Sequence, residues 1–373
     1  MKKVLGLLLA LLMVFTLVGC GAKEEGGEEA STSDTIEIAM VTDVGQLNDG
    51  GFNQYTYAGV QQYASENGVT EKYFQPANGA DATDDDRIAA MHQAIEAGAK
   101  VIVLPGYLQA AALEAVAKEN PEVKFVWVDG WNIGLQNVTA ICYKEEQSGF
   151  LAGYGVTVDG YTSFGFTGGG AGTNAAVNRF ASGYVQGINA AAKELGITAD
   201  VIVSFQYGAG FGPSNELQTQ ISGWLSNGTQ VVFSCGGSML QSVKAAAAEN
   251  PDAKIIGVDN DQASESEQVI TTATKNLQGS VVRTLTQWAE GKWDAELADV
   301  TLKLGAAEDG VNLPTADSSW RFTTFTKDQY NKMFEDLKSG ALVVDDTVGA
   351  DMSTADAWAD IAKACTNVKL TVE

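Results

Sequence analysis

Three aspartates, Asp43, Asp129 and Asp259, each follow a short apolar run that is typical of a β-strand. In open parallel sheets, ligands bind outside the carboxyl ends of the strands. If these strands belong to two lobes that face each other, the three carboxylates point into one cleft. Carboxylates bind N–H and O–H donors and repel phosphates and other carboxylates. The pattern therefore predicts a site for a ligand that is rich in hydrogen-bond donors.

The composition limits the chemistry that the chain can carry out. Of 373 residues, 47 are acidic and 23 are basic, for a formal net charge of −24. Such a chain lacks the clustered lysines and arginines that binding of nucleic acid requires. His92 is the only histidine, so a Ser-His-Asp or Cys-His set is excluded unless His92 belongs to it. We expect a binding protein and not an enzyme, with no cofactor and no metal, and His92 as a surface or half-buried residue without chemistry.

Three cysteines lie in the body of the chain: Cys142, Cys235 and Cys365. An odd number without CxxC spacing supports neither a disulfide framework nor a metal site. Cys142 and Cys235 lie in apolar, strand-like runs, and we expect both to be small buried hydrophobic residues.

An internal repeat indicates how the aspartates are positioned. The stretch AVAKENPEVKFVWVDG at 115–130 is matched, 130 residues later, by AAAAENPDAKIIGVDN at 245–260. The same offset pairs Gly106 with Gly236 and Asp129 with Asp259. Two unrelated βα units could converge on similar turns, but two similar α/β lobes are the better interpretation. The repeat then places one aspartate per lobe at equivalent strand ends.

Short β-branched runs alternate with alanine-rich helical stretches from Ile36 onward, which predicts βαβ units and parallel sheets. The expected strands are Ile36–Val41, Val101–Leu104, Phe125–Val128, Val138–Cys142, Phe164–Thr167, Val201–Phe205, Val231–Ser234, Ile255–Val258 and Val269–Ala273. The expected helices include Asn53–Asn67, Asp84–Ala97, Ala110–Glu119, Asn178–Leu195, Asn215–Ser226 and Ser242–Glu249. The length exceeds what one hydrophobic core usually covers. We therefore predict an α/β protein with two lobes, each a parallel sheet flanked by helices.

Three further residues have a role that spacing alone leaves open. Phe52, at the start of a predicted helix, could be a core anchor or a platform on which a ring stacks. Phe211 lies in the glycine-rich loop 208–212, where an apolar side chain has little core to join, so we expect it to face a cleft. Lys275 follows an apolar strand, and the usual outcome for a lysine is a solvated surface position.

The glycine-rich segment 168–175 matches a loose dinucleotide fingerprint, Gly170-x-Gly172-x-x-Ala175. The next strand, however, ends in Gln206-Tyr207 and offers no acid to hold a ribose. A tight turn between a strand and a helix explains the glycines without a nucleotide.

The N-terminus is typical of a targeting segment. Two lysines precede the fifteen-residue apolar stretch Val4–Val18, which is short for a membrane span and suits a secretory signal. It ends in Leu17-Val18-Gly19-Cys20, which resembles the lipobox of bacterial lipoproteins. We expect a signal peptide at 1–19, lipidation of Cys20, and an acidic tether at 20–35 whose Gly, Ser and Glu residues have no apolar periodicity. A noncleaved anchor with an incidental cysteine is the alternative.

Taken together, these residues resemble the basic membrane lipoprotein family of ABC-transporter substrate-binding proteins, whose characterised members include purine nucleoside receptors. The resemblance runs from about Ile36 to Val282 and is weaker beyond. Its most specific pieces are Asp49-x-x-Phe52-Asn53-Gln54, Phe150–Tyr154, Gly236-Gly237 and Val258–Gln262. It implies a two-lobed type I periplasmic-binding-protein fold with the ligand in the cleft between the lobes.

In the nucleoside receptors of this family, a base lies between two aromatic rings and carboxylates bind the base and the ribose. The resemblance implies that Phe52 and Phe211 are the rings and that Asp43 and Asp129 face the base. It also implies that Asp259, Lys275 and the backbone of Gly236 hold the ribose hydroxyls. Asn53, in the same motif as Phe52, completes the predicted site.

The sequence departs from the family on the ligand side. Gly50-Gly51 stands where the family usually has Lys-Ser, Ser238-Met239 stands where it often has Thr-Gly, and the loop that holds Phe211 lacks the family's usual acidic residue. A receptor for another polar solute, such as a sugar or a vitamin, is therefore an alternative to a nucleoside receptor. A nucleotide-dependent enzyme and a structural or adhesive surface lipoprotein are alternatives from other classes.

We predict a monomeric receptor, anchored by lipid to the extracytoplasmic face of the cell membrane, that delivers a nucleoside to an ABC permease. Closure of the lobes would bury the ligand. We place lobe one at 36–142 plus 263–302, and lobe two at 143–262 plus 303–373. In the C-terminal extension of lobe two, Trp320 and Trp358 are expected to be packing residues.

Overall fold

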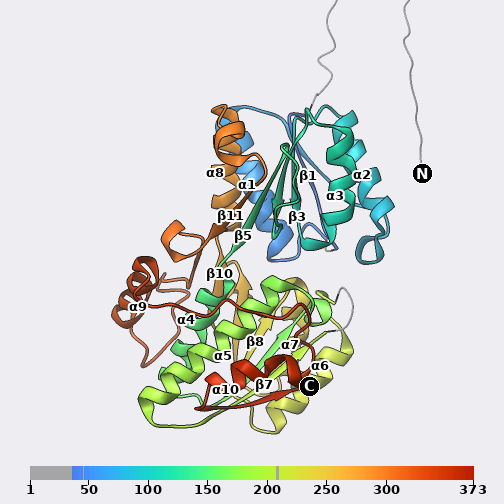
Figure 1. The fold of residues 1–373 in the computed structure, drawn as a ribbon. Helices are drawn as coiled ribbons and strands as arrows, with labels where there is room; N and C mark the ends of the chain where they lie inside the picture. The colour runs from blue at the N-terminus through green and yellow to red at the C-terminus, as the bar shows by residue number, and fades with distance from the viewer. Residues whose placement is uncertain (1–35, 45, 207–209) are drawn as a thin grey trace, which may run out of the picture. The chain divides into compact units, whose positions relative to one another are not determined.

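A computed structural model describes residues 36–373 apart from residues 45 and 207–209 (Figure 1). The expected signal peptide at 1–19, the expected lipidation site Cys20 and the expected tether at 20–35 lie outside the described residues. Among the helices of the described part, none is long and apolar enough to cross a membrane. The described chain is an α/β protein with two sheets, as predicted, and each sheet with its helices forms one lobe.

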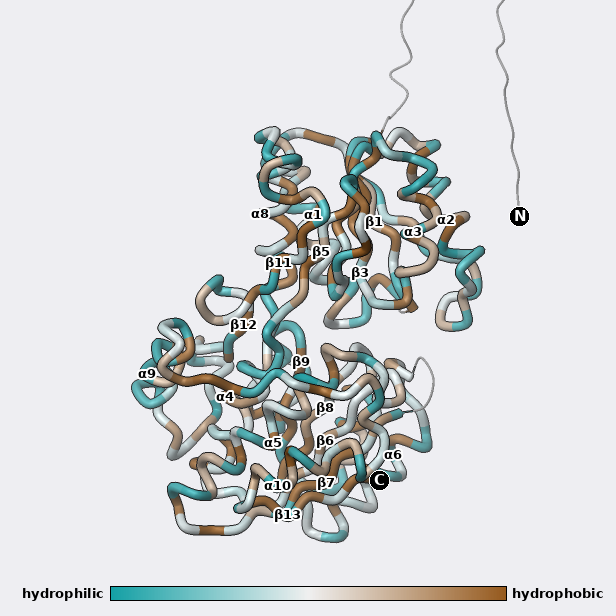
Figure 2. The backbone as a smooth tube through the Cα atoms, in the orientation of Figure 1, coloured by the Kyte–Doolittle hydropathy of each residue, from teal (hydrophilic) through white to brown (hydrophobic). Residues whose placement is uncertain are grey.

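The sheet of lobe one has six strands in the order β11-β5-β4-β3-β1-β2, and every neighbouring pair is parallel. These strands are β1 (Ile38–Val41), β2 (Glu71–Phe74), β3 (Val101–Pro105), β4 (Lys124–Val128), β5 (Val138–Tyr143) and β11 (Val300–Leu304). Helices α1 (Phe52–Asn67) and α8 (Leu277–Ala289) cover one face, and α2 (Asp84–Glu96) and α3 (Ala110–Glu119) cover the other (Figure 1). Because both faces are covered, the central strands are apolar throughout, as their brown colour in Figure 2 shows.

The sheet of lobe two has seven strands in the order β12-β10-β9-β8-β6-β7-β13, and only the β10–β12 pair is antiparallel. These strands are β6 (Ser163–Gly168), β7 (Ala199–Phe205), β8 (Val231–Cys235), β9 (Lys254–Asp259), β10 (Val269–Lys275), β12 (Val311–Asn312) and β13 (Val368–Val372). The helices are α4 (Glu145–Val158), α5 (Ala175–Leu195), α6 (Asn215–Ser226), α7 (Leu240–Ala247), α9 (Lys327–Ser339) and α10 (Ala359–Ala364). Helices α4 and α5 lie together on one face, and α6 and α7 lie together on the other (Figure 1).

The central strands of the two sheets follow the same order, which agrees with the internal repeat, whereas lobe two has β13 as an additional edge strand and an antiparallel β12 where lobe one has the parallel β11. Strands β3 and β4 of lobe one correspond to β8 and β9 of lobe two, with the same central place in each sheet. The backbone at the ends of these strands also matches: Gly106 and Gly236 both have positive φ, and so do Asp129 and Asp259. The lobes are therefore related in backbone geometry as well as in sequence.

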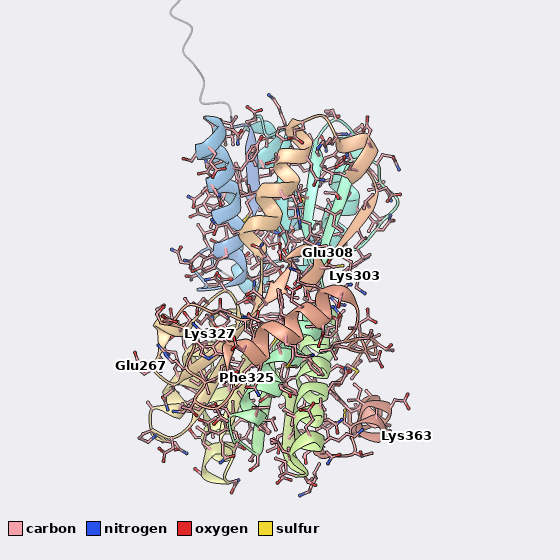
Figure 3. The ribbon with its side chains drawn as sticks, turned by 90° about the vertical axis from the view of Figure 1, so that its left-hand side faces the viewer. Glu267, Lys303, Glu308, Phe325, Lys327 and Lys363 are labelled. Atoms are coloured by element: carbon pink, nitrogen blue, oxygen red, sulfur yellow. The ribbon has the colours of Figure 1, made fainter. Side chains whose placement is uncertain are left out.

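The chain passes between the lobes after β5, after β10 and after β11. We expected residues 263–275 in lobe one. They belong to lobe two instead, since β10 pairs with β9 and β12 in the sheet of that lobe. The sequence repeat ends before β10 and gives no signal for its partner strands. The predicted boundaries at 142/143 and 302/303 fall close to the ends of β5 and β11. Lys303 and Glu308, on either side of the last crossing, lie at the level between the lobes in Figure 3.

The C-terminal segment belongs to lobe two, where β12 and β13 join the sheet and α9 packs on α4. Trp358 is fully buried and stacks on Phe205 with ring centroids 6.5 Å apart. Trp320 stacks on Phe325 with ring centroids 5.7 Å apart, and Phe325 lies beside α9 in Figure 3. Both tryptophans are packing residues, as expected.

Helices α4 and α5 approach each other closely through glycines spaced four residues apart on each helix: Gly149 and Gly153 on α4, and Gly183 and Gly187 on α5. A Cβ atom at Gly183 would lie 2.0 Å from the carbonyl oxygen of Glu146, and one at Gly187 would lie 2.1 Å from that of Phe150. No side chain fits at either position without moving one helix. The contact fixes the start of α4 against α5, directly after the first crossing between the lobes.

We expect Gly183→Ala to lower the free energy of unfolding by about 1–3 kcal/mol, because the added methyl group forces the two helices apart. Urea unfolding followed by circular dichroism measures the change. Gly223→Ala is the matched control, since a Cβ atom there has no neighbour within 4 Å and alanine favours a helix over glycine by roughly 1 kcal/mol. Equal stability of the two variants would contradict the close packing of α4 and α5.

Candidate functional site

A cavity of about 420 Å³ lies between the two lobes, and both lobes line it. The lobe-one lining comes from the loop after β1, the start of α1 and the ends of β3 and β4. The lobe-two lining comes from the start of α5, the loop before α6 and the ends of β8, β9 and β10. All eight residues of the predicted binding site line this cavity: Asp43, Phe52, Asn53, Asp129, Phe211, Gly236, Asp259 and Lys275.

The buried carboxylates of Asp129 and Asp259 end equivalent segments of the two lobes. Both residues have left-handed backbone conformations, with φ of 59° and 69°. This conformation is uncommon outside glycine, and Asp is one of the residues that tolerate it. Burial raises the pKa of Asp259 to about 6, although the Lys275 ammonium works in the opposite direction. Burial also raises the pKa of Asp129, again against the effect of Lys275.

Lys275, the last residue of β10, is a buried cation and not a surface lysine, since its side chain is only 3% exposed. Its Nζ lies 2.7 Å from Oδ2 of Asp129 and 3.6 Å from Oδ1 of Asp259. The first contact joins lobe two to lobe one. Burial lowers the pKa of Lys275, but the surrounding carboxylates outweigh it and raise that pKa above its usual range.

Lys275 is also surrounded by aromatic rings. Its Nζ lies 4.9 Å from the ring centroid of Phe52, 5.4 Å from that of Tyr143 and 5.6 Å from that of Phe180. Such contacts are attractive because the face of an aromatic ring is electronegative. The rings and the carboxylates together offset the loss of hydration that the buried ammonium suffers.

Asp43 lies in lobe one, at the end of β1, and its carboxylate packs against Gly106. A Cβ atom at Gly106 would lie 1.9 Å from Oδ2 of Asp43, so only glycine leaves room for the carboxylate. Burial raises the pKa of Asp43 to about 7; the nearby Arg87 guanidinium lowers it and the charge of Asp129 raises it further. Oδ1 of Asp43 and Oδ1 of Asp129 are buried without a hydrogen-bond partner among the described residues. Both residues line the cavity, and an ionised carboxylate accepts from N–H and O–H donors.

Asn53 has a structural part in the site. Its Oδ1 accepts from the backbone N–H of Asp43 at 3.2 Å, and its Nδ2 donates to Asp49 at 3.2 Å. Asp49 in turn accepts from the backbone N–H groups of Asn53 and Gln54, which belong to the unsatisfied first turn of α1. Asn53 therefore links the loop of Asp43 to the start of α1.

Two phenylalanines line the cavity from opposite lobes. Phe52 is the first residue of α1 in lobe one, and Phe211 lies in the loop before α6 in lobe two. Both side chains are partly buried, and Phe211 packs against Gly169 and Gly236, where a Cβ atom would come within 3 Å of its ring. Phe52 packs against the apolar core of lobe one and also forms a wall of the cavity.

The glycine-rich segment 168–175 forms a turn before α5. The side chain of Asn174 accepts from the backbone N–H groups of Ala176 and Val177. A phosphate at the start of this helix would need those N–H groups, so the turn is not arranged as a dinucleotide site. His92 does not line the cavity and is paired with Glu119 at 3.8 Å.

Across residues 36–373, leaving aside the gaps, no three His, Cys, Asp or Glu side chains converge in a way that could hold a metal ion. Cys235 is buried and lines the cavity, whereas Cys142 is half-buried, which corrects our expectation of full burial. Cys142 is the last residue but one of β5, close to the first crossing.

Sequence reasoning missed several residues around the cavity. Phe180 and Tyr107 line it, and Glu145 and Arg179 continue the charge cluster behind Lys275. Tyr107 could have been found, because it follows Gly106 at the end of a predicted strand. Phe180 and Arg179 lie within a long apolar helix and Glu145 follows a strand, so no local spacing marks them.

Comparison with known proteins places the chain in a family. Residues 36–364 match the family described as ABC transporter substrate-binding protein, PnrA-like. The chain is 27% identical over 360 residues to a Lactococcus lactis protein named "ABC transporter nucleoside-binding protein BmpA", with 90% of this chain and 96% of that protein covered. It is 25% identical to basic membrane protein D of Borreliella burgdorferi, with 81% and 84% covered. It is also 25% identical to an uncharacterized lipoprotein of Pyrococcus abyssi, with 86% and 79% covered.

Solved structures show the same fold. A solute-binding protein of an ABC transporter system from Aeropyrum pernix superimposes with a TM-score of 0.72 at 19% identity, covering 89% of this chain and 97% of that chain. A second solute-binding protein, from Conexibacter woesei, has a TM-score of 0.63 at 21% identity, with 83% and 99% covered. The fold is the two-lobed type I periplasmic architecture, and, together with the match over residues 36–364, this chain belongs to the PnrA-like family of ABC transporter substrate-binding proteins.

Proposed function

We propose that this protein captures a nucleoside with a purine base between its lobes and delivers it to the permease of an ABC transporter. Membership in the family implies a small-molecule ligand and a permease partner, and the family consists of substrate-binding proteins rather than enzymes. The observation that supports a nucleoside is that two aromatic residues, Phe52 and Phe211, line one cavity together with Asp43 and Asp129. Each of these two aspartates has a carboxylate oxygen without a hydrogen-bond partner among the described residues. A relative at 27% identity is named as nucleoside-binding.

The base would lie between Phe52 and Phe211, since a flat heteroaromatic ring gains from contact with aromatic faces. Oδ1 of Asp43 and Oδ1 of Asp129 would accept from its N–H groups. Each is buried and would otherwise remain without a partner, and an unpaired buried acceptor costs about 1–3 kcal/mol. A donor on the ligand removes that cost, so a ring that bears N–H groups is favoured.

The ribose would lie toward lobe two, against Asp259, Lys275 and the backbone of Gly236. Asp259 accepts from hydroxyl groups, and Lys275 donates to their oxygens. The cavity lining contains four carboxylates, those of Asp43, Asp49, Asp129 and Asp259, and a single ammonium, that of Lys275. A neutral ligand is therefore favoured over a phosphorylated one, because like charges juxtaposed in a site cost several kcal/mol.

We infer the cellular context from the sequence and from the relatives. The Leu17-Val18-Gly19-Cys20 segment supports lipidation of Cys20 and attachment to the extracytoplasmic face of the membrane, and several relatives are named lipoproteins. The acidic tether at 20–35 would let the lobes reach the permease. We propose that the protein acts as a monomer, since one chain supplies both walls of the cavity.

Calorimetric titration tests the proposal directly. Residues 35–373 are expressed without the lipid, unfolded and refolded to remove retained ligand, and titrated with purine nucleosides, their 5′-monophosphates, free bases, ribose and riboflavin. We expect tight binding of a nucleoside, and binding at least tenfold weaker for its base, for ribose and for its monophosphate. A well-folded protein that ignores every nucleoside, or that prefers ribose or riboflavin, would refute the nucleoside and favour another polar solute.

Ligand affinity should fall as the pH is lowered from 8 to 5.5, by roughly tenfold or more. Asp43 and Asp259, with pKa values of about 7 and about 6, must be ionised to accept from N–H and O–H groups. The stability of the ligand-free protein should change in the opposite sense and increase as the pH is lowered. Its raised carboxyl pKa values mean that the folded state holds more protons than the unfolded state, so stability increases as the pH falls from 7 toward 4.

Titrations between pH 5.5 and 8 measure the effect on affinity, and thermal unfolding of the ligand-free protein between pH 4 and 7 measures the effect on stability. In Asp43→Asn the part of the affinity change near pH 7 should disappear, whereas Asp252→Asn, at an exposed position before β9, should behave as wild type. An affinity that is constant over this range would show that the buried carboxylates do not bind the ligand.

Replacing Asp259 by asparagine should weaken nucleoside binding by about 1.5–3 kcal/mol, or roughly 10- to 100-fold, because a charged acceptor is lost. Asparagine tolerates the left-handed conformation at this position, so the fold should be kept. Asp309→Asn is the matched control: Asp309 has φ of 54° but is exposed and lies outside the cavity. If both variants bind as wild type does, Asp259 is not in the ligand site.

A further inference from the structure

Glu145 lies behind Lys275 and does not line the cavity. It is the first residue of α4, directly after the chain crosses from lobe one to lobe two, and its side chain is fully buried. One carboxylate oxygen, Oε2, lies 2.6 Å from Nε of Arg179 on α5. The other, Oε1, lies 3.7 Å from Nζ of Lys275 and has no hydrogen-bond partner among the described residues.

We propose that Glu145 and Arg179 are positioning residues that hold the Lys275 ammonium at the floor of the cavity, where it meets Asp129 when the lobes are together. The inference rests on the proposed function in one respect, namely that Lys275 and Asp129 face the ligand. Neither Glu145 nor Arg179 would touch that ligand.

The division of these residues between the lobes supports the proposal. Lys275, Asp259, Glu145 and Arg179 all lie on elements of lobe two, and Asp129 lies on lobe one. When the lobes separate, Asp129 must leave Lys275, which then keeps Asp259 and Glu145 as its carboxylate neighbours. A lysine has a long, flexible side chain, and with Glu145 removed, only Asp259 would hold its ammonium in lobe two.

Arg179 decides how strongly Glu145 can act on Lys275. Its guanidinium donates to Oε2 and leaves Oε1 turned to the ammonium. The packing of α4 on α5 fixes this pair, because the glycine contacts between the helices begin one turn beyond it. The rings of Phe52, Tyr143 and Phe180 also lie close to Nζ of Lys275. The Tyr143 hydroxyl and the thiols of Cys142 and Cys235 face the same charges, and burial raises the pKa of each, so all three stay neutral below pH 8.5.

The electrostatic effects of the two residues on the ligand-facing carboxylates have opposite signs. The charge of Glu145 raises the pKa of Asp129 and of Asp259, while the charge of Arg179 lowers the pKa of Asp129. Removing either charge should therefore shift the pH at which ligand affinity is lost, and the two shifts should have opposite directions. A residue that only stabilises the fold would not produce this pattern.

The test is the pH profile of nucleoside affinity, measured by calorimetry on the refolded protein from pH 5 to 8.5. In Glu145→Gln the loss of affinity should move to lower pH, and in Arg179→Met to higher pH, each by roughly half a pH unit or more. Affinity at pH 8 should fall several-fold in both, because Lys275 is no longer fixed. Glu146→Gln is the control: burial raises the pKa of this neighbouring glutamate to about 7, so it titrates in the same range. It makes no ion pair with Lys275 and is not among the charges that shift the pKa of Asp129 or Asp259, so its profile should match wild type.

A ligand-free measurement separates failure of this inference from failure of the proposed function. The unfolding stabilities of Glu145→Gln, Lys275→Met and the double variant form a cycle that needs no nucleoside, and we expect their effects to be non-additive. Coupling without any nucleoside binding would overturn the proposed function only. Additive effects, or pH profiles of Glu145→Gln and Arg179→Met that coincide with that of Glu146→Gln, would overturn the positioning role.

Discussion

The buried ammonium of Lys275 is the interaction on which the cavity depends. Two carboxylates of the cavity, Asp129 and Asp259, come within 3.6 Å of it, and Glu145 lies at 3.7 Å behind it. Without a cation among them, buried carboxyl groups this close together would take up protons rather than stay charged. A neutral carboxyl would lose part of its value as an acceptor. The charge of Lys275 thus favours the ionised forms of Asp129 and Asp259, in which a carboxylate accepts hydrogen bonds.

The duplicated fold explains how the partners of this lysine come together. Parallel strands of two related sheets end at the same cavity, so Asp129 and Asp259 arrive at equivalent strand ends with the same left-handed backbone. Lys275 is the last residue of β10, next to the second crossing, and Glu145 directly follows the first. The charge cluster therefore lies where the lobes are joined. The contact between Lys275 and Asp129 is both part of this cluster and a link between the two lobes.

Much of the fold and most of the site could be predicted from the sequence, for reasons that differ between residues. The apolar central strands and the alanine-rich helices have strong periodicity, and all nine expected strands are present within about two residues of their predicted ends. The repeat located Asp129 and Asp259, and the family resemblance named Phe52, Phe211 and Lys275, all of which line the cavity. Their contact with a ligand stays a prediction.

The missed features have weak or non-local signals. Strand β2 reads Glu-Lys-Tyr-Phe at a sheet edge, and β12 is a two-residue strand, so neither has an apolar pattern. The lobe assignment of 263–275 was wrong because only pairing with β9 and β12 decides it. The burial of Lys275 depends on Asp129, 146 residues earlier in the chain. No local spacing reports an ion pair of that separation.

The most direct test of the account is a crystal structure of the refolded protein with its tightest-binding purine nucleoside. We expect the base between Phe52 and Phe211, with ring nitrogens within hydrogen-bond distance of Asp43 and Asp129. The ribose should lie against Asp259 and Lys275. A nucleoside bound outside the cavity, or bound in it with the base away from both rings, would contradict the account.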